Sequence, residues 1–207
     1  MDKRQIAVVM ATSLEAAPLI KALSLDALGK NPFPIFGNGD IVLLLSGIGK
    51  ANAAMATAHC LMRHDPDWIC NLGAAGALDR EHPLGEIYQI DKVLDYDRPT
   101  FITGKPHAYK PHLFKGIDTA RLATRDRPVY GREERELMSR DADLCDMEGA
   151  AVAQACALFG KKAFLLKFVS DNPDQSRSRD IIANIRRYRS AAAEFFIESA
   201  LPAMRKA

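Results

Sequence analysis

The chain has 207 residues, of which 48% are hydrophobic and 26% are charged, a composition that excludes disorder, collagen and coiled coil as the main architecture. Its 28 Lys and Arg residues nearly balance its 26 Asp and Glu residues, and the net charge of +2 argues against nucleic acid as a partner. The length suits a single domain, which we expect to span residues 1–207.

Short apolar runs bounded by turn residues predict five buried strands, at residues 6–11, 41–45, 68–72, 86–94 and 163–169. Apolar residues that recur every three or four positions predict helices from Ile48 to Met62, from Met147 to Leu158 and from Ile181 to Ser199. Strands that alternate with helices predict an α/β fold, with a central mixed β-sheet flanked by helices on both sides.

Two stretches lack a clear period. Residues 96–111 contain three prolines and a glycine, and predict a long loop or irregular crossover of the kind that is often functional. Residues 171–180 form a second irregular stretch, just before the last predicted helix.

The four cysteines show no CxxC spacing and lie in apolar stretches, at Cys60, Cys70, Cys145 and Cys156. They predict reduced, partly buried thiols and therefore a cytoplasmic protein. The first apolar run is too short for a signal peptide, and Glu15 interrupts it. Because no stretch approaches the ~20 apolar residues of a membrane span, we expect a soluble protein without a membrane partner.

Two glycine-containing segments follow predicted strands. Residues 46–50 (SGIGK) open a helix, where backbone N–H groups favour an anion, but Ala51 stands where a P-loop has Ser or Thr. A plain strand-to-helix turn is the better interpretation of this segment alone. Residues 73–77 (GAAGA) predict a turn that either lets a ligand approach the backbone or packs tightly.

Three carboxylates are placed where chemistry is expected. Glu15 and Asp171 follow predicted strands, and Glu148 opens a predicted helix. If these strands are parallel, the three side chains meet at one edge of the sheet, where shielded carboxylates act as general acids or bases. Each alone is more often a helix cap or a solvated residue, so their convergence is what favours a site.

Other kinds of site are disfavoured. The five histidines have no metal-ligand spacing, and no serine lies in a GxSxG elbow. We therefore expect no metal and no cofactor. The arginines between residues 177 and 189 are interpreted as a solvated helix face.

Six motifs in order resemble those of the nucleoside phosphorylase and nucleosidase superfamily, and most closely its 5'-methylthioadenosine/S-adenosylhomocysteine nucleosidases. They are MATSLE at residues 10–15, SGIGK at 46–50, NLGAAG at 71–76, LGEI at 84–87, DMEGA at 146–150 and SDNPD at 170–174. The resemblance covers nearly the whole chain and fades over residues 95–116. It implies hydrolysis of the N-glycosidic bond between a ribose and a purine-like base.

The resemblance also implies roles for individual residues. Asp171 would protonate or hydrogen-bond the departing base near its N7, and Glu15 would hold and deprotonate the attacking water. Glu148 would bind ribose hydroxyls, and Met147 would pack against the sugar. The other substrate-binding positions that it implies are Ala74, Gly76, Asp146 and Ser170.

Either water or phosphate can be the nucleophile in this superfamily. Phosphorylases usually carry an arginine and a Ser or Thr where this chain has Asn71 and Ala74, and neither of these can clamp phosphate. The charge of Glu15 would also repel it. Hydrolysis is therefore favoured, with two alternatives: a phosphorylase that uses an unrecognised phosphate site involving Lys50, and a nucleoside-binding relative without activity.

The base and the assembly are less defined by the sequence. Tyr130 is a candidate for stacking on the base, while Arg125 and Arg127 are either solvated or meet a carboxylate-bearing substrate such as futalosine, which a related branch hydrolyses. Because members of the superfamily commonly form dimers or larger rings in which a neighbour completes the pocket, we expect a homo-oligomer. The stretch 96–111 would contribute to its interface.

Overall fold

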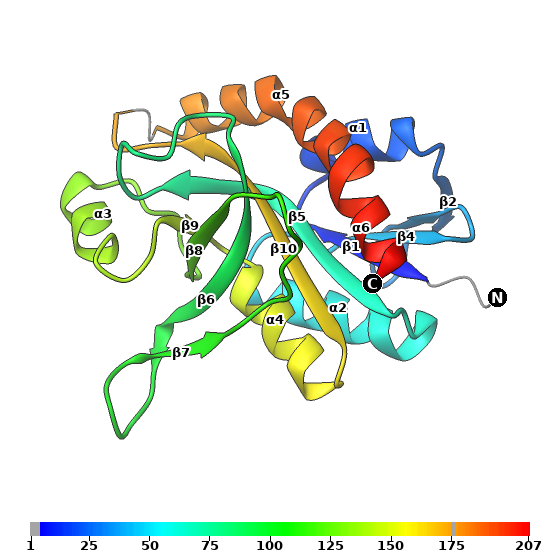
Figure 1. Ribbon diagram of the computed structural model, residues 1–207, viewed down its shortest axis with the longest axis horizontal. Coiled ribbons are helices and arrows are strands. Elements are labelled where there is room, and N and C mark those ends of the chain that lie inside the picture. Colours follow the sequence, from blue (N-terminus) through cyan, green and yellow to red (C-terminus); the bar gives the residue numbers. More distant parts are fainter. Residues whose placement is uncertain (1–4, 175–176) are drawn as a thin grey trace.

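A computed structural model describes residues 5–174 and 177–207 (Figure 1). Its centre is a ten-stranded sheet. The strands are β1 (Ile6–Met10), β2 (Asp26–Gly29), β3 (Ile35–Gly37), β4 (Ile41–Leu45), β5 (Trp68–Ala77), β6 (Ile87–Pro99), β7 (Pro106–Tyr109), β8 (Thr119–Thr124), β9 (Leu144–Asp146) and β10 (Lys162–Asp171). The helices are α1 (Ser13–Ala22), α2 (Lys50–His64), α3 (Arg132–Met138), α4 (Gly149–Leu158), α5 (Ser178–Phe195), the π-helical turn η1 (Phe196–Ala200) and α6 (Leu201–Lys206).

Parallel strands form the middle of the sheet. Strand β1 pairs in parallel with β4 and β5, and β10 runs parallel to β5 on its other side. Antiparallel pairs join β10 to β6 and the end of β5 to β9, while β8 pairs in parallel with β6 and β9. The five strands β5, β10, β6, β8 and β9 therefore close into a ring, and the sheet is mixed as predicted.

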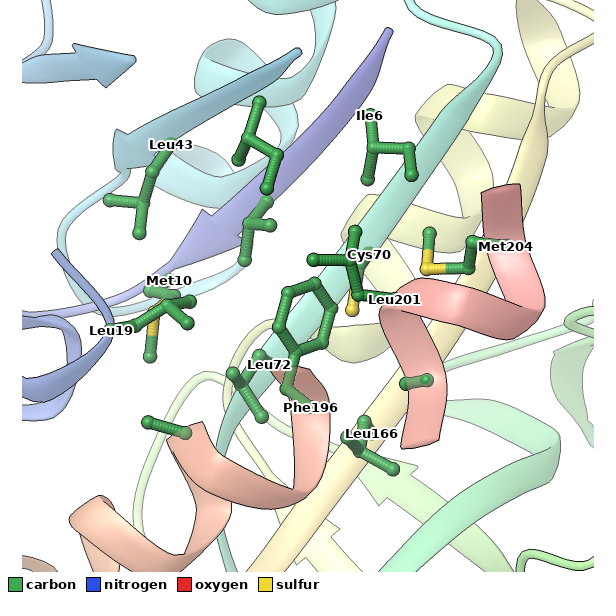
Figure 2. Close-up of a cluster of buried hydrophobic side chains, with 14 of the residues drawn as sticks. Ile6, Met10, Leu19, Leu43, Cys70, Leu72, Leu166, Phe196, Leu201 and Met204 are labelled. Atoms are coloured by element: carbon green, nitrogen blue, oxygen red, sulfur yellow. The ribbon is translucent and has the colours of Figure 1, made fainter. Parts of the chain in front are cut away.

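Helices cover both faces of the sheet. Helices α1, α5 and α6 pack on one face over an apolar cluster that includes Leu19, Leu72 and Phe196 (Figure 2). Helices α2 and α4 cover the other face through residues such as Cys60 and Val152. This arrangement confirms the predicted α/β fold.

Two segments differ from the sequence prediction. Residues 73–77 do not turn but continue β5, because they pair with β10 and β9. Their small side chains leave room for buried carboxylates beside the strand. Residues 96–111 are not a long loop: β6 runs to Pro99 and pairs with β7 in a hairpin. Prolines are tolerated there because Pro99 is the last residue of β6 and Pro106 the first residue of the edge strand β7, so both lie at the ends of the ladder. The second irregular stretch is shorter than predicted: β10 ends at Asp171, α5 begins at Ser178, and residues 175–176 between them lie outside the described part.

The four cysteines are free and buried, in agreement with the sequence prediction. None of the helices in the described residues is long and apolar enough to span a membrane.

Candidate active site

A cavity of about 360 Å³ opens where β1, β5 and β10 end, a size that suits a small-molecule ligand. Residues 127–130 and the first turns of α5 form its outer wall. All of the site residues that the sequence suggested line this cavity: Glu15, Ala74, Gly76, Asp146, Met147, Glu148, Ser170 and Asp171.

Glu15 is positioned by the start of α1 and by strand β5. Thr12 is the N-cap of α1, and its hydroxyl donates to Glu15 Oε2 at 2.6 Å. The Ala74 N–H donates to Glu15 Oε1 at 2.9 Å. A side chain at Gly73 would come within 3.2 Å of the same oxygen, so the glycine lets the carboxylate lie against the strand. Both oxygens are thereby fixed, and the carboxylate faces the cavity.

Behind this carboxylate lies a buried ion pair that the sequence analysis did not include. Lys167 on β10 pairs with Asp146, with Nζ 2.8 Å from Oδ2, and both side chains are almost wholly buried. Burial opposes the charge on Lys167, but the negative charges of Asp146, Glu148 and Glu15 outweigh it and raise the lysine pKa above its usual value. A permanent positive charge therefore sits among the acidic residues of the site.

Asp146 also caps helix α4. Its oxygens accept hydrogen bonds from Thr124 Oγ1 at 2.6 Å and from the Gly149 N–H at 2.8 Å. Lys167 is its third partner, so the Asp146 carboxylate is bound by three groups of the protein, although the residue lines the cavity.

Glu148 reaches the cavity from the loop between β9 and α4. The three carboxylates do not converge through parallel strands alone. Strand β9 is antiparallel to β5, and its pairing with the last residues of β5 places Glu148 at the cavity. Burial, together with the negative charge of Asp146, raises the pKa of Glu148 to about 7, although Lys167 and the Gly49 N–H oppose this shift.

The backbone N–H groups of the glycine turn before α2 bind carboxylates of the protein rather than a free anion. Gly47 and Gly49 have φ angles of 82° and 101°, which confirms the predicted strand-to-helix turn. The Gly49 N–H donates to Glu148 Oε1 at 2.8 Å, and the Lys50 N–H donates to Asp126 Oδ1 at 3.1 Å. Two carboxylates therefore occupy donors of the helix N-terminus.

Asp171 ends β10 beside Gly76 of β5. A Cβ at position 76 would lie 2.6 Å from Asp171 Oδ2, so only glycine leaves space for this carboxylate. Ser170 Oγ donates to Asp171 Oδ1 at 2.7 Å, and the buried guanidinium of Arg135 pairs with Oδ2. The side chain of Asp171 is thus held from both sides.

The cations suggested by the sequence are all paired. Lys50 Nζ lies 2.9 Å from Asp95, 3.3 Å from Asp126 and 3.5 Å from Asp97. Arg125 pairs with Asp97 and Glu134, and it is not among the described residues that line the cavity. Arg127 does line its rim, where it pairs with Glu134 and keeps a 60% exposed side chain.

The rest of the cavity wall is mainly apolar. Ile48 and Tyr130 lie on it, and one turn of α5 contributes Ile181, Ile182 and Ile185. Cys145 also lines it, but burial raises its pKa to about 12, so it is a neutral thiol rather than a nucleophile. Within residues 5–174 and 177–207, no group of three or more His, Cys, Asp or Glu residues has the geometry of a metal site.

Sequence reasoning missed two buried cations of this site. Lys167 gave a signal, since a lysine within the apolar run 163–169 is unusual in a buried strand. Arg135 gave none, because it lies in the polar segment REERELM beside the exposed Arg132. Only the packing of α3 distinguishes the two arginines.

Comparison with known proteins identifies the family. Residues 5–201 match the family model described as the phosphorylase superfamily. The chain belongs to this superfamily. It is 33% identical over 158 residues to the 5'-methylthioadenosine/S-adenosylhomocysteine nucleosidase of Hydrogenovibrio crunogenus, covering 64% of this chain and 68% of that protein. It is 22% identical over 221 residues to the aminodeoxyfutalosine nucleosidase of Helicobacter pylori, covering 93% and 96% of the two chains.

Solved structures share the phosphorylase-superfamily fold. The Helicobacter pylori 5'-methylthioadenosine/S-adenosylhomocysteine nucleosidase bound to butyl-thio-DADMe-Immucillin-A superposes with a TM-score of 0.85, at 19% identity, over 98% of this chain and 100% of the other. The Arabidopsis thaliana 5'-methylthioadenosine nucleosidase gives 0.84 at 22% identity, over 100% and 96%. These comparisons confirm the predicted family and the predicted class of enzyme, a nucleosidase.

Proposed function

We propose that this protein hydrolyses the N-glycosidic bond of purine nucleosides of the 5'-methylthioadenosine/S-adenosylhomocysteine type, giving the free base and the sugar. The observation that carries the proposal is the convergence of Glu15, Glu148 and Asp171 on one cavity, each held by different hydrogen-bond donors. Two or more carboxylates around one glycosidic carbon are what glycoside hydrolysis requires.

Glu15 is the proposed base. Hydrogen bonds from Thr12 and the Ala74 N–H fix its carboxylate on the cavity wall, where it would hold the attacking water. It takes the proton as this water attacks the anomeric carbon. Lys167 lies behind Gly73, and its positive charge offsets the repulsion between the acidic residues of the site.

Asp171 is the proposed partner of the leaving base. A purine leaves poorly as an anion, so Asp171 must carry a proton on its carboxyl group and deliver it, or donate a hydrogen bond, near N7 of the base to lower the barrier. Ser170 orients the carboxylate, and Gly76 leaves the space it needs. Glu148 accepts hydrogen bonds from ribose hydroxyls, and Met147 packs against the sugar. The carboxylate of Glu148 thereby stabilises the positive charge that develops on the sugar.

Water, rather than phosphate, is the proposed nucleophile. Arg127 is the one lysine or arginine among the described residues that line the cavity, and Glu134 neutralises it. Lys50, the candidate phosphate ligand, has three carboxylates around its ammonium group. Donors at the start of α2 are occupied by Glu148 and Asp126. A phosphate would find like charges where it needs cations.

The proposal is tested by base release from 5'-methylthioadenosine, S-adenosylhomocysteine, adenosine, inosine and futalosine in phosphate-free buffer, followed by chromatography. We expect adenine from at least one of the first three. Release of no base from any compound, combined with tight binding, would instead support the inactive nucleoside-binding relative.

Aminodeoxyfutalosine-type nucleosides are the second candidate substrates. Two observations favour them. The match to the Helicobacter pylori aminodeoxyfutalosine nucleosidase spans 93% of this chain. Arg127 stands at the cavity rim with a 60% exposed side chain, so a carboxylate on the 5' group would compete with Glu134 for it. Faster base release from a carboxylate-bearing nucleoside than from 5'-methylthioadenosine, lost in Arg127→Met, would favour this candidate.

A homo-oligomer in a reducing compartment such as the cytoplasm completes the proposal. The tip of the β6–β7 hairpin presents Phe101 and Ile102 fully to solvent, which is costly unless another surface covers them. Figure 1 shows this hairpin extending away from the body of the molecule. Four free, buried cysteines are consistent with a reducing environment.

A further inference from the structure

Arg135 is a deeply buried arginine near the cavity, with 1% of its surface exposed. It lies on α3, a short polar helix outside the sheet, and its side chain reaches inward. Nη1 donates to the Ala77 carbonyl, while Nη2 donates to the Val129 carbonyl and to Asp171 Oδ2. One guanidinium thus joins the end of β5, the cavity wall and the end of β10.

This arginine reaches a ligand only through its neighbours. The residues that line the described cavity include Asp171 and Val129 but not Arg135, which lies behind them. Its Nε has no hydrogen-bond partner, so the guanidinium is held through its two terminal nitrogens, Nη1 and Nη2. A buried guanidinium without a carboxylate would be strongly unfavourable, which ties Arg135 to Asp171.

The Asp171 carboxylate is held by a two-sided clamp. Ser170 Oγ donates to Oδ1, Arg135 donates to Oδ2, and Gly76 forms the floor beneath. A carboxylate held by a charged, planar donor keeps one orientation better than a carboxylate in contact with water. Such fixed orientation is what a group that meets the departing base requires.

We propose that Arg135 is a positioning residue, which orients the Asp171 carboxylate toward the purine base and acts on the reaction only through it. The inference rests on the proposed role of Asp171. It gives α3, which otherwise buries only Met138 among its described residues, a direct connection to the reacting groups through Arg135. A competing role for Arg135 is purely structural, since it also fastens the wall at Val129.

A double-mutant cycle separates the two roles. Asp171→Asn is expected to lower kcat for 5'-methylthioadenosine by roughly 10²–10⁴-fold. Arg135→Met is expected to lower kcat by about 10–100-fold with little change in KM, because the carboxylate loses its orientation while the sugar site stays intact. If Arg135 acts through Asp171, the double variant has a kcat close to that of Asp171→Asn alone.

Three further variants complete the design. Arg135→Lys keeps the charge and should recover part of the lost kcat. Arg132→Met changes an exposed arginine on the same helix, paired at 3.5 Å with Asp174, and should leave kcat and KM as in the wild type. Arg135→Gln, which keeps an N–H donor for the carbonyl groups, replaces Arg135→Met in the cycle if the latter does not fold.

The outcomes are distinct. A double variant that loses the product of the two single effects, or an Arg135→Met variant that raises KM at unchanged kcat, overturns the proposal and makes Arg135 a wall residue. The same cycle measured as adenine affinity by calorimetry needs no turnover. If the wild type hydrolyses no nucleoside but adenine binding weakens non-additively, the proposed activity fails while the role of Arg135 stands; additive weakening overturns that role.

Discussion

The three carboxylates of the cavity are alike in chemistry but differ in their partners. Glu15 accepts from a hydroxyl and a backbone N–H, Asp171 accepts from a hydroxyl and a guanidinium, and Glu148 accepts from the N-terminus of α2. These differences in environment are what allows acidic residues in one site to take separate roles. Lys167 supplies the positive charge that lets them share the site.

The raised pKa of Glu148 predicts a pH-dependent KM. With a pKa of about 7, the carboxyl group is ionised above pH 7 and protonated below it. Ribose hydroxyls donate best to the ionised form, so the KM for nucleoside should rise as the pH falls from 8 to 6. Steady-state kinetics across this range test the expectation. Glu148→Gln should show a high KM that no longer changes there; an unchanged slope in this variant would assign the titration to another group.

Lys167 should be important for stability as well as for the site. Because its ion pair with Asp146 is buried, Lys167→Met leaves an uncompensated carboxylate and should lower the free energy of unfolding by about 3–5 kcal/mol. The matched control is Lys161→Met, since Lys161 pairs with a largely exposed Asp65 and its loss should cost less than about 1 kcal/mol. Urea denaturation compares the two. Equal, small losses would show that the buried pair contributes little.

At the level of elements, β5 shows why the site is built from small residues. The strand carries Gly73 against Glu15 and Gly76 against Asp171, so each carboxylate lies where a side chain would otherwise project. The sequence marked residues 73–77 as a place of close approach but assigned them to a turn. Small residues indicate proximity, and they do not reveal whether the backbone continues or bends.

Replacing Gly76 tests this use of space. In Gly76→Ala the new Cβ would lie 2.6 Å from Asp171 Oδ2 and displace the carboxylate, so we expect kcat to fall by roughly 10–100-fold. Gly29→Ala is the control, because no atom lies within 4 Å of its Cβ, and its activity should equal that of the wild type. Full activity in Gly76→Ala would show that the position of Asp171 is not critical.

Elements with strong apolar patterns could be predicted, and short or polar ones could not. Strand β4 was predicted with its actual bounds because its five residues are apolar and buried on both faces. Strand β9, with three residues, has too little sequence to show a period, and the four residues of β7 begin with a proline and show no apolar run. Contacts between distant segments, such as Arg135 with Asp171, leave no local trace at all.

At the scale of the whole molecule, the closed ring of strands explains how residues far apart in sequence form one site. The ends of β1, β5, β9 and β10 meet beside one cavity, and helices on both faces hold the sheet in this shape. Because the order of the motifs along the chain follows these strand ends, the sequence could indicate the site residues before their geometry was known.

The exposed hairpin tip predicts assembly. Phe101 and Ile102 should be buried between copies of the chain, so Phe101→Ser combined with Ile102→Ser should shift the protein toward the monomer. Light scattering coupled to gel filtration measures this. A wild-type protein that is monomeric at micromolar concentration would remove the reason for placing an interface at the hairpin.

The central claim is that Glu15 activates water in a site that cannot hold phosphate. The most direct measurement is the product formed from 5'-methylthioadenosine by the wild type and by Glu15→Gln, each with and without phosphate. We expect the wild type to release adenine and a free sugar at a rate that phosphate does not change, and the variant to be slower by at least about 10²-fold. Release that requires phosphate and yields a sugar 1-phosphate would contradict the claim.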